Sequence, residues 1–150
     1  MNVAFLGRGS ITAARHLAEM LNRAGVNGSV VITAAAGADG ADVLVMLSPV
    51  ASKRKISCHI LVAPCGADDG NVRCDRKLCC GMGEENEITA SSVGEKTCIA
   101  SLGREVKTLS GKIIERCEMR VEKVKGLSPE ALLAVIGCAL MLDAPSDKII

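Results

Sequence analysis

The sequence predicts a single α/β domain, in which a mostly parallel sheet from the N-terminal half joins an antiparallel β-meander and is covered by two main helices. The first observation is a short apolar run that ends in glycines and leads into helical periodicity. The second is a series of further β-branched runs, and the third is alternation of apolar and polar residues after residue 88. With 49% hydrophobic and 23% charged residues, residues 1–150 suit one folded domain.

The first unit is expected to be a strand, a glycine turn and a helix. Residues Asn2 to Leu6 form the apolar run, and Gly7-Arg8-Gly9-Ser10 follows it. Apolar residues then recur at helical spacing, which predicts a helix with Ser10 as its N-cap and Gly25 just past its end. His16 falls on the polar face of this predicted helix.

Three further strands are predicted at residues 29–32, 42–47 and 56–63, where β-branched and other apolar residues cluster. Buried runs that follow a strand–helix unit are typical of a parallel sheet. The stretch from Pro64 to Glu87 is rich in Gly, Asp and Cys, which predicts a loop with a short helix around Val72 to Leu78.

The second half predicts about three antiparallel strands and a final helix. Residues 88–124 alternate between apolar and polar types, with turns expected at Gly94 and Ser110-Gly111. Ser128-Pro129-Glu130 supplies an N-cap, a proline at the first helical position and an acidic first turn. This helix is expected to run to about Leu142; because it is apolar nearly all round, it must be buried, in part against a partner protein or a second copy.

Composition excludes several classes of function. Eighteen basic and 17 acidic residues give a net charge of +1, which argues against nucleic-acid binding. Phe5 is the one aromatic residue, so stacking platforms are absent. No apolar stretch approaches the ~20 residues of a membrane span, and no basic segment precedes the first apolar run, so we expect a cytosolic chain with reduced thiols.

Four of the eight cysteines form a possible metal or redox cluster. Cys65, Cys74, Cys79 and Cys80 lie within a short stretch, but their one close spacing, Cys74-x4-Cys79, is wider than that of typical zinc pairs. Zinc binding therefore stays a minor alternative to free thiols. Cys98, Cys117 and Cys138 lie in apolar surroundings and are interpreted as small core residues.

The glycine turn and the helix after it resemble the ATP-binding segment of Mur ligases. In that family a strand leads into Gly-Thr-Asn-Gly-Lys-Thr-Thr and a helix of the form Ala-x-x-Leu-Ala-x-x-Leu-x-x-Ala-Gly. Here Gly7-Arg8-Gly9-Ser10-Ile11-Thr12-Ala13 precedes a helix that matches this form from Ala14 to Gly25. An apolar strand followed by Asp68-Asp69, a meander, Gly126 and an Ala- and Leu-rich helix then follow in the order of the Mur ligase central domain.

The resemblance implies ATP and magnesium as ligands, with a set of candidate nucleotide- or anion-binding residues. These are Gly7, Arg8, Gly9, Ser10, Thr12, Asp68 and Asp69. Backbone amides at a glycine turn before a helix can bind an anion, although a tight turn and, for Asp68-Asp69, a solvated turn are the simpler structural interpretations.

The departures from the family argue against ligase activity. Ile11 stands where the phosphate-binding lysine is expected, and Ser10 replaces the preceding glycine. The chain also has no room for the UDP-binding and C-terminal domains of full Mur ligases. We therefore expect a shortened, degenerate, non-catalytic module for binding or regulation. A ligase component completed by a partner chain and a small cysteine-based metal or redox protein are the alternatives.

Overall fold

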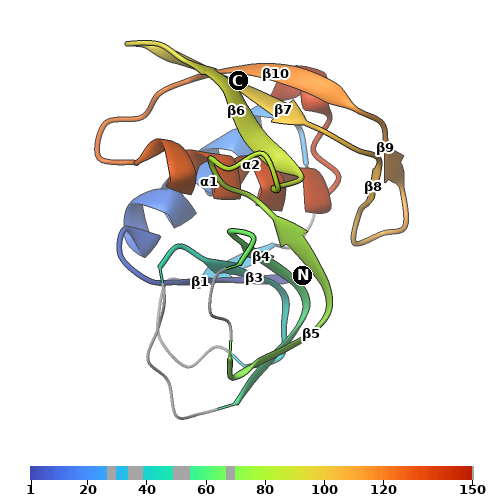
Figure 1. The fold of residues 1–150 in the computed structure, drawn as a ribbon. Helices are drawn as coiled ribbons and strands as arrows, with labels where there is room; N and C mark the ends of the chain where they lie inside the picture. The colour runs from blue at the N-terminus through green and yellow to red at the C-terminus, as the bar shows by residue number, and fades with distance from the viewer. Residues whose placement is uncertain (27–29, 34–38, 49–54, 67–69, 150) are drawn as a thin grey trace.

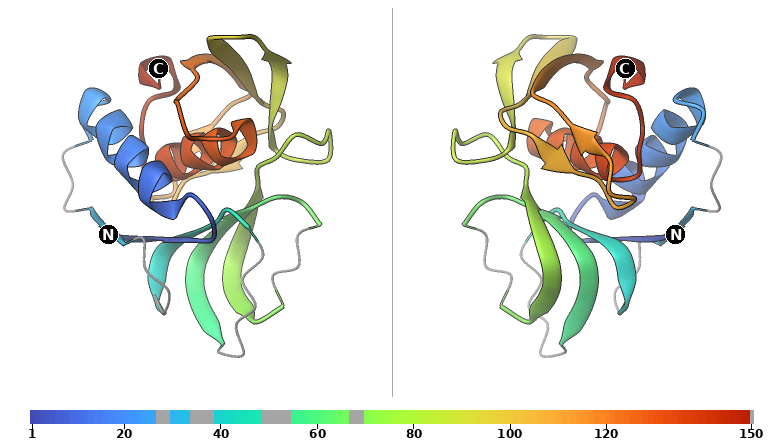
Figure 2. Two further views of the ribbon diagram at one scale, coloured as in Figure 1. Left: turned by 90° about the vertical axis from the view of Figure 1, so that its left-hand side faces the viewer. Right: turned by 90° about the vertical axis from the view of Figure 1, so that its right-hand side faces the viewer.

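The computed structural model describes residues 1–26, 30–33, 39–48, 55–66 and 70–149 (Figure 1). Two helices pack side by side on one face of a parallel sheet, and a smaller antiparallel sheet covers the second helix from the other side, so the chain forms three layers (Figure 2). The predicted α/β class, with a parallel sheet, antiparallel strands and two main helices, is confirmed.

The parallel sheet has five strands in the order β2-β1-β3-β4-β5. They are β1 (Asn2–Leu6), β2 (Val31–Thr33), β3 (Ala41–Met46), β4 (Ile56–Ala63) and β5 (Val72–Cys79). Val3 of β1 pairs with Ile32 on one side and with Val43 on the other, so the strand order reverses at β1.

Both faces of β3 and of the second half of β4, from Ile60 to Ala63, are buried. Val43, Val45, Ile60 and Val62 belong to the main core together with the helices, whereas Leu44, Met46, Leu61 and Ala63 belong to a second apolar cluster. Burial on both faces explains why these strands read as continuous apolar runs and not as alternating patterns.

Helix α1 (Ser10–Arg23) ends as predicted but begins differently. The N–H of Gly25 donates to the Asn22 carbonyl and the N–H of Val26 to the Leu21 carbonyl, which is a Schellman motif. The N-cap is Gly9 and not Ser10, because the turn closes one residue earlier. His16 is buried rather than on the polar face, so that interpretation of the sequence was wrong.

Helix α2 (Pro129–Met141) forms the centre of the molecule. The Ser128 hydroxyl accepts the N–H of Ala131 at 3.1 Å, which confirms the predicted cap. Every residue from Leu132 to Met141 is buried within the chain itself, so the described residues already cover this helix, which is apolar nearly all round.

The antiparallel half contains the three expected strands and one hairpin that the pattern did not predict. Strands β6 (Ile88–Val93), β7 (Thr97–Leu102) and β10 (Cys117–Glu122) pair in the order β10-β7-β6. In the sequence, the hairpin of β8 (Val106–Lys107) and β9 (Ile113–Ile114) comes between β7 and β10. A short 3₁₀ helix, Ser146–Lys148, follows α2.

The short helix predicted around Val72 to Leu78 is wrong, because this segment is strand β5. Its backbone pairs with β4 from Ile56 and Val72 up to Ala63 and Cys79. As an edge strand, β5 carries exposed charged residues such as Arg73, Asp75 and Arg76, which obscured the strand pattern in the sequence.

Candidate functional site

The glycine turn between β1 and α1 has a backbone that only glycine adopts readily. Gly7 and Gly9 have φ angles of 105° and 86°. A Cβ atom on Gly7 would lie 2.6 Å from the backbone nitrogen of Ser48, so β1 and the end of β3 approach too closely for any side chain. The turn is therefore shaped by its contact with the neighbouring strand.

Three hydrogen bonds hold the turn in place. The Arg8 N–H donates to the Ser48 hydroxyl at 3.0 Å, and the Ser10 hydroxyl donates to the Gly7 carbonyl at 2.6 Å. The N–H of Leu47 donates to the Leu6 carbonyl at 2.8 Å. Arg8 and Ser10 thus contribute to the turn's rigidity.

The amino terminus of α1 has no side-chain cap, since its N-cap is Gly9. The first amides of a helix lack partners within the helix, and the helix dipole makes this end favourable for an anion. Of the side chains around it, Arg8 is exposed and Thr12 is half-buried. Ile11 is 68% exposed, so the position expected to hold a phosphate-binding lysine carries an apolar group in solvent.

The turn lies at the carboxyl edge of the parallel sheet, at the strand where the order reverses. In open α/β sheets ligands bind in the crevice outside the carboxyl ends of the strands at this switch point. A hollow of about 470 Å³ lies elsewhere, at the amino ends of β4 and β5, where Asp39, Lys55 and Arg73 line it. Asp68 and Asp69 lie outside the described residues.

The four cysteines of the predicted cluster divide into three places. Cys65 follows β4, and its thiol lies near enough to that of Cys79, at the end of β5, to raise the pKa of Cys79. Cys80 points under α2, where its sulfur lies 2.5 Å from the position of a Cβ on Gly137. Cys74 pairs in register with Cys58, five residues before Cys79, which is about 16 Å along a strand. Among the described residues no group of three potential metal ligands is brought together.

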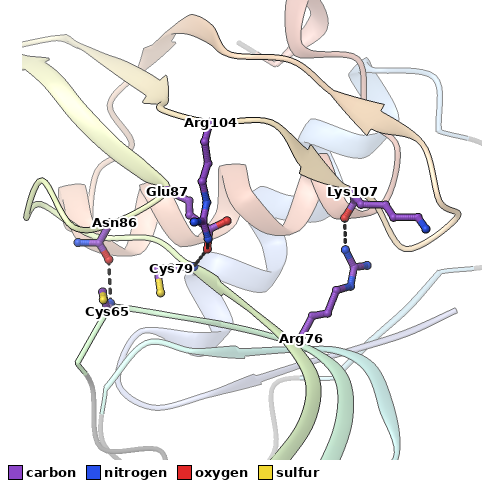
Figure 3. Close-up of polar contacts among 7 residues, drawn as sticks. All are labelled: Cys65, Arg76, Cys79, Asn86, Glu87, Arg104 and Lys107. Carbon is purple, nitrogen blue, oxygen red and sulfur yellow. Dashed lines mark hydrogen bonds and ion pairs between the residues drawn. The ribbon is translucent and has the colours of Figure 1, made fainter.

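Asn86 and Glu87 contact Cys65 and Cys79, but no sequence pattern identified them as site residues (Figure 3). Asn86 is buried, and its Oδ1 accepts the N–H of Cys65 at 2.8 Å. Glu87 Oε1 accepts the N–H of Cys79 at 3.2 Å and pairs with the Arg104 guanidinium at 3.1 Å. These contacts depend on the return of the chain after β5, which sequence spacing does not reveal.

Neither histidine lies where it could activate a thiol. His59 is exposed on β4, and its Nδ1 lies 2.7 Å from Asp75 Oδ2, a hydrogen bond that raises the pKa of His59. His16 lies on α1, with Glu19 at 4.0 Å from its Nδ1. The partner that the structure gives to each histidine is therefore a carboxylate, from Asp75 for His59 and from Glu19 for His16.

Comparison with protein-family models and with curated proteins finds no match to this chain. Within the described ranges, no helix has the length and apolar character needed to cross a membrane.

Proposed function

We propose that this chain is a non-catalytic binding module, a shortened relative of the Mur ligase central domain, whose ligand is a phosphate-bearing anion at the glycine turn. The observation that carries the proposal is the uncapped amino terminus of α1, held by Gly7 and Gly9 where the sheet order reverses. The first backbone amides of a helix, the helix dipole and the position in the sheet all favour an anion there.

The side chains around the turn favour binding without catalysis. Phosphoryl chemistry needs a cation that neutralises the β- and γ-phosphate oxygens, and Ile11 cannot supply one. Arg8 is the cation within the turn itself, while Ser10 is engaged by the Gly7 carbonyl. The expected ligand is a small phosphate compound, with a nucleotide as the class that the resemblance implies, held weakly through backbone amides.

A substitution at Ile11 tests this proposal by gain of function. Ile11→Lys restores the missing cation at a position already 68% exposed, so it should cost little stability. A new unit charge about 6 Å from an anion in water is worth about 0.7 kcal/mol, or about a threefold gain in affinity. Pyrophosphate and Mg-ADP titrations followed by amide NMR should show this gain, with the largest shifts at residues 8–12.

The matched control is Ile113→Lys, because Ile113 is also an exposed isoleucine, at 61%, on the distant hairpin strand β9. Both variants change net charge equally, so a nonspecific charge effect would raise the anion affinity of both. The proposal fails when pyrophosphate shifts no amide of the glycine turn in either the natural chain or Ile11→Lys. A turnover of ATP by the natural chain would instead contradict the non-catalytic assignment.

A further inference from the structure

We infer that Cys65 and Cys79 are a reversible disulfide site that links the segment after β4 to the end of β5. The inference does not depend on anion binding at the glycine turn, since it uses different residues and a different measurement. Three observations support it: the proximity of the two thiols, the fixed backbones of both cysteines, and the separation of the neighbouring thiols.

The two thiols lie near each other at neighbouring strand ends. Cys79 pairs across the parallel sheet with Ala63, and Cys65 follows Ala63 by two residues. The Cys65 thiol is near enough to the Cys79 thiol to raise its pKa, and Figure 3 shows the two side chains near the ends of β4 and β5. A disulfide between them would join the ends of two strands that already pair in register.

Two consecutive residues hold the backbones of the two cysteines. Asn86 accepts the amide hydrogen of Cys65, and Glu87 accepts that of Cys79. Asn86 in turn donates through Nδ2 to the Gly83 carbonyl at 2.9 Å, and Arg104 holds Glu87. Because one short segment fixes both amides, the thiols are preorganised toward each other, which lowers the entropy cost of joining them.

The remaining cysteines nearby are directed elsewhere. Cys80 is adjacent to Cys79 but is fully buried between the sheet and Gly137. Cys74 lies beside Cys58 near the other end of β5. Cys65 and Cys79 are both half-buried, so a small reagent can reach them more readily than the buried Cys58, Cys80, Cys98 and Cys138.

The chemistry is thiol–disulfide exchange with a small-molecule disulfide such as oxidised glutathione. One protein thiolate attacks the reagent and releases one reduced thiol, which leaves a mixed disulfide on the protein. The second protein thiolate then attacks the mixed disulfide and releases another reduced thiol, so two protein thiols are oxidised and one reagent disulfide is reduced. Burial, with the hydrogen bond from Cys65, raises the pKa of Cys79 to about 11, so the exchange should speed up from pH 7 to pH 9.

Digestion with trypsin separates the cysteines of β4, of the start of β5 and of the end of β5 into different peptides. Cleavage after Lys55, Arg73, Arg76, Lys77 and Lys96 places Cys65 with Cys58 in residues 56–73, Cys74 in residues 74–76, and Cys79 with Cys80 in residues 78–96. After oxidation of the folded protein by glutathione disulfide and alkylation of the free thiols, we expect the crosslinked pair 56–73 and 78–96 by mass spectrometry. Reduction with dithiothreitol should abolish it.

Three variants identify the cysteines that form the crosslink. Cys65→Ser and Cys79→Ser should each lose the crosslinked pair, whereas Cys74→Ser, a half-buried cysteine on the same strand, should keep it. The bond closes a loop from residue 65 to residue 79, which should raise the melting temperature of the oxidised Cys74→Ser protein by several degrees but not that of oxidised Cys65→Ser. A crosslink between residues 56–73 and 74–76, or mixed disulfides with glutathione as the sole product, would overturn the inference.

Discussion

At the scale of single residues, His16 is the clearest departure from the sequence pattern. Helical periodicity placed it on the polar face of α1, but its side chain is buried and its Nε2 has no hydrogen-bond partner among the described residues. Burial lowers the pKa of His16, the Arg23 charge lowers it further, and Glu19 partly opposes them. A neutral, unsatisfied imidazole inside the molecule costs stability.

We expect His16→Leu to stabilise the protein by about 1 kcal/mol or more, because an apolar side chain of similar size removes the unsatisfied nitrogen. At the size of this domain, 1 kcal/mol corresponds to a rise of about 2–4 °C in melting temperature. Thermal unfolding followed by circular dichroism at pH 7.5 measures it. A lower melting temperature would show that His16 Nε2 makes a hydrogen bond that stabilises the folded protein.

The same variant should also change the dependence of stability on pH. The folded state binds the His16 proton less readily than the unfolded state does, so stability is fully present above the ordinary histidine pKa of about 6.5 and falls as pH drops through the lowered folded pKa. The loss for one group cannot exceed about 1.4 kcal/mol per pH unit. Between pH 7 and pH 5 the natural chain should therefore lose more stability than His16→Leu, and parallel curves would refute this explanation.

At the scale of elements, the central contact is between α2 and the end of β5. Gly137 lies so close to β5 and β6 that a Cβ would be 2.5 Å from the Cys80 sulfur and 3.2 Å from a Leu78 methyl. The glycine weakens the helix by about 1 kcal/mol in propensity, but it permits this approach. The missing side chain of Gly137 thus leaves room for the Cys80 sulfur against the helix.

Gly137→Ala should destabilise the protein by about 1–2 kcal/mol, since the cost of overpacking exceeds the gain in helix propensity. Cys80→Ala removes the sulfur that the new methyl would meet, so the double variant should be more stable than the sum of the two single effects implies. Urea unfolding of all four proteins gives the coupling. Strictly additive effects would show that the helix shifts away instead.

Elements were predictable where one physical signal dominated. Strand β4 and helix α2 were predicted nearly to the residue, because a buried apolar run and a Ser-Pro cap are unambiguous locally. Strand β5 was missed because its charged residues are explained only by its position at a sheet edge. The glycine turn was found as a motif, whereas its contact with Ser48 and the Asn86–Glu87 contacts to two cysteines depend on residues far apart in sequence.

At the scale of the whole molecule, one core joins the three layers. Side chains from the parallel sheet, both helices and the antiparallel sheet belong to the same apolar cluster, which includes Val45, Leu17, Ile136 and Val121. The sequence predicted the α/β class from its periodicity, but it did not reveal that α2 lies between two sheets, because an all-round apolar helix shows only that it is buried.

We expect the two sheets to unfold together. Val45→Ala in β3 and Val121→Ala in β10 each remove two buried methyl groups and should each cost about 2 kcal/mol. Because the chain has no Trp or Tyr, far-UV circular dichroism and the alkylation of buried Cys98 and Cys138 serve as probes of unfolding. Each variant should lower the midpoint of a single unfolding transition that both probes share. Two separated transitions would show that the sheets unfold as independent units.

The buried position of α2 also sets the order in which the chain can complete its core during translation. The ribosome has made all five parallel strands by residue 79, but the helix that covers their inner face ends at residue 141. At about 5–20 residues per second, the apolar side chains of β3 and β4 stay uncovered by α2 for roughly 3 to 12 s after β5 has been synthesised. The nascent chain therefore has a period of seconds in which chaperone binding and aggregation compete for the same exposed sheet.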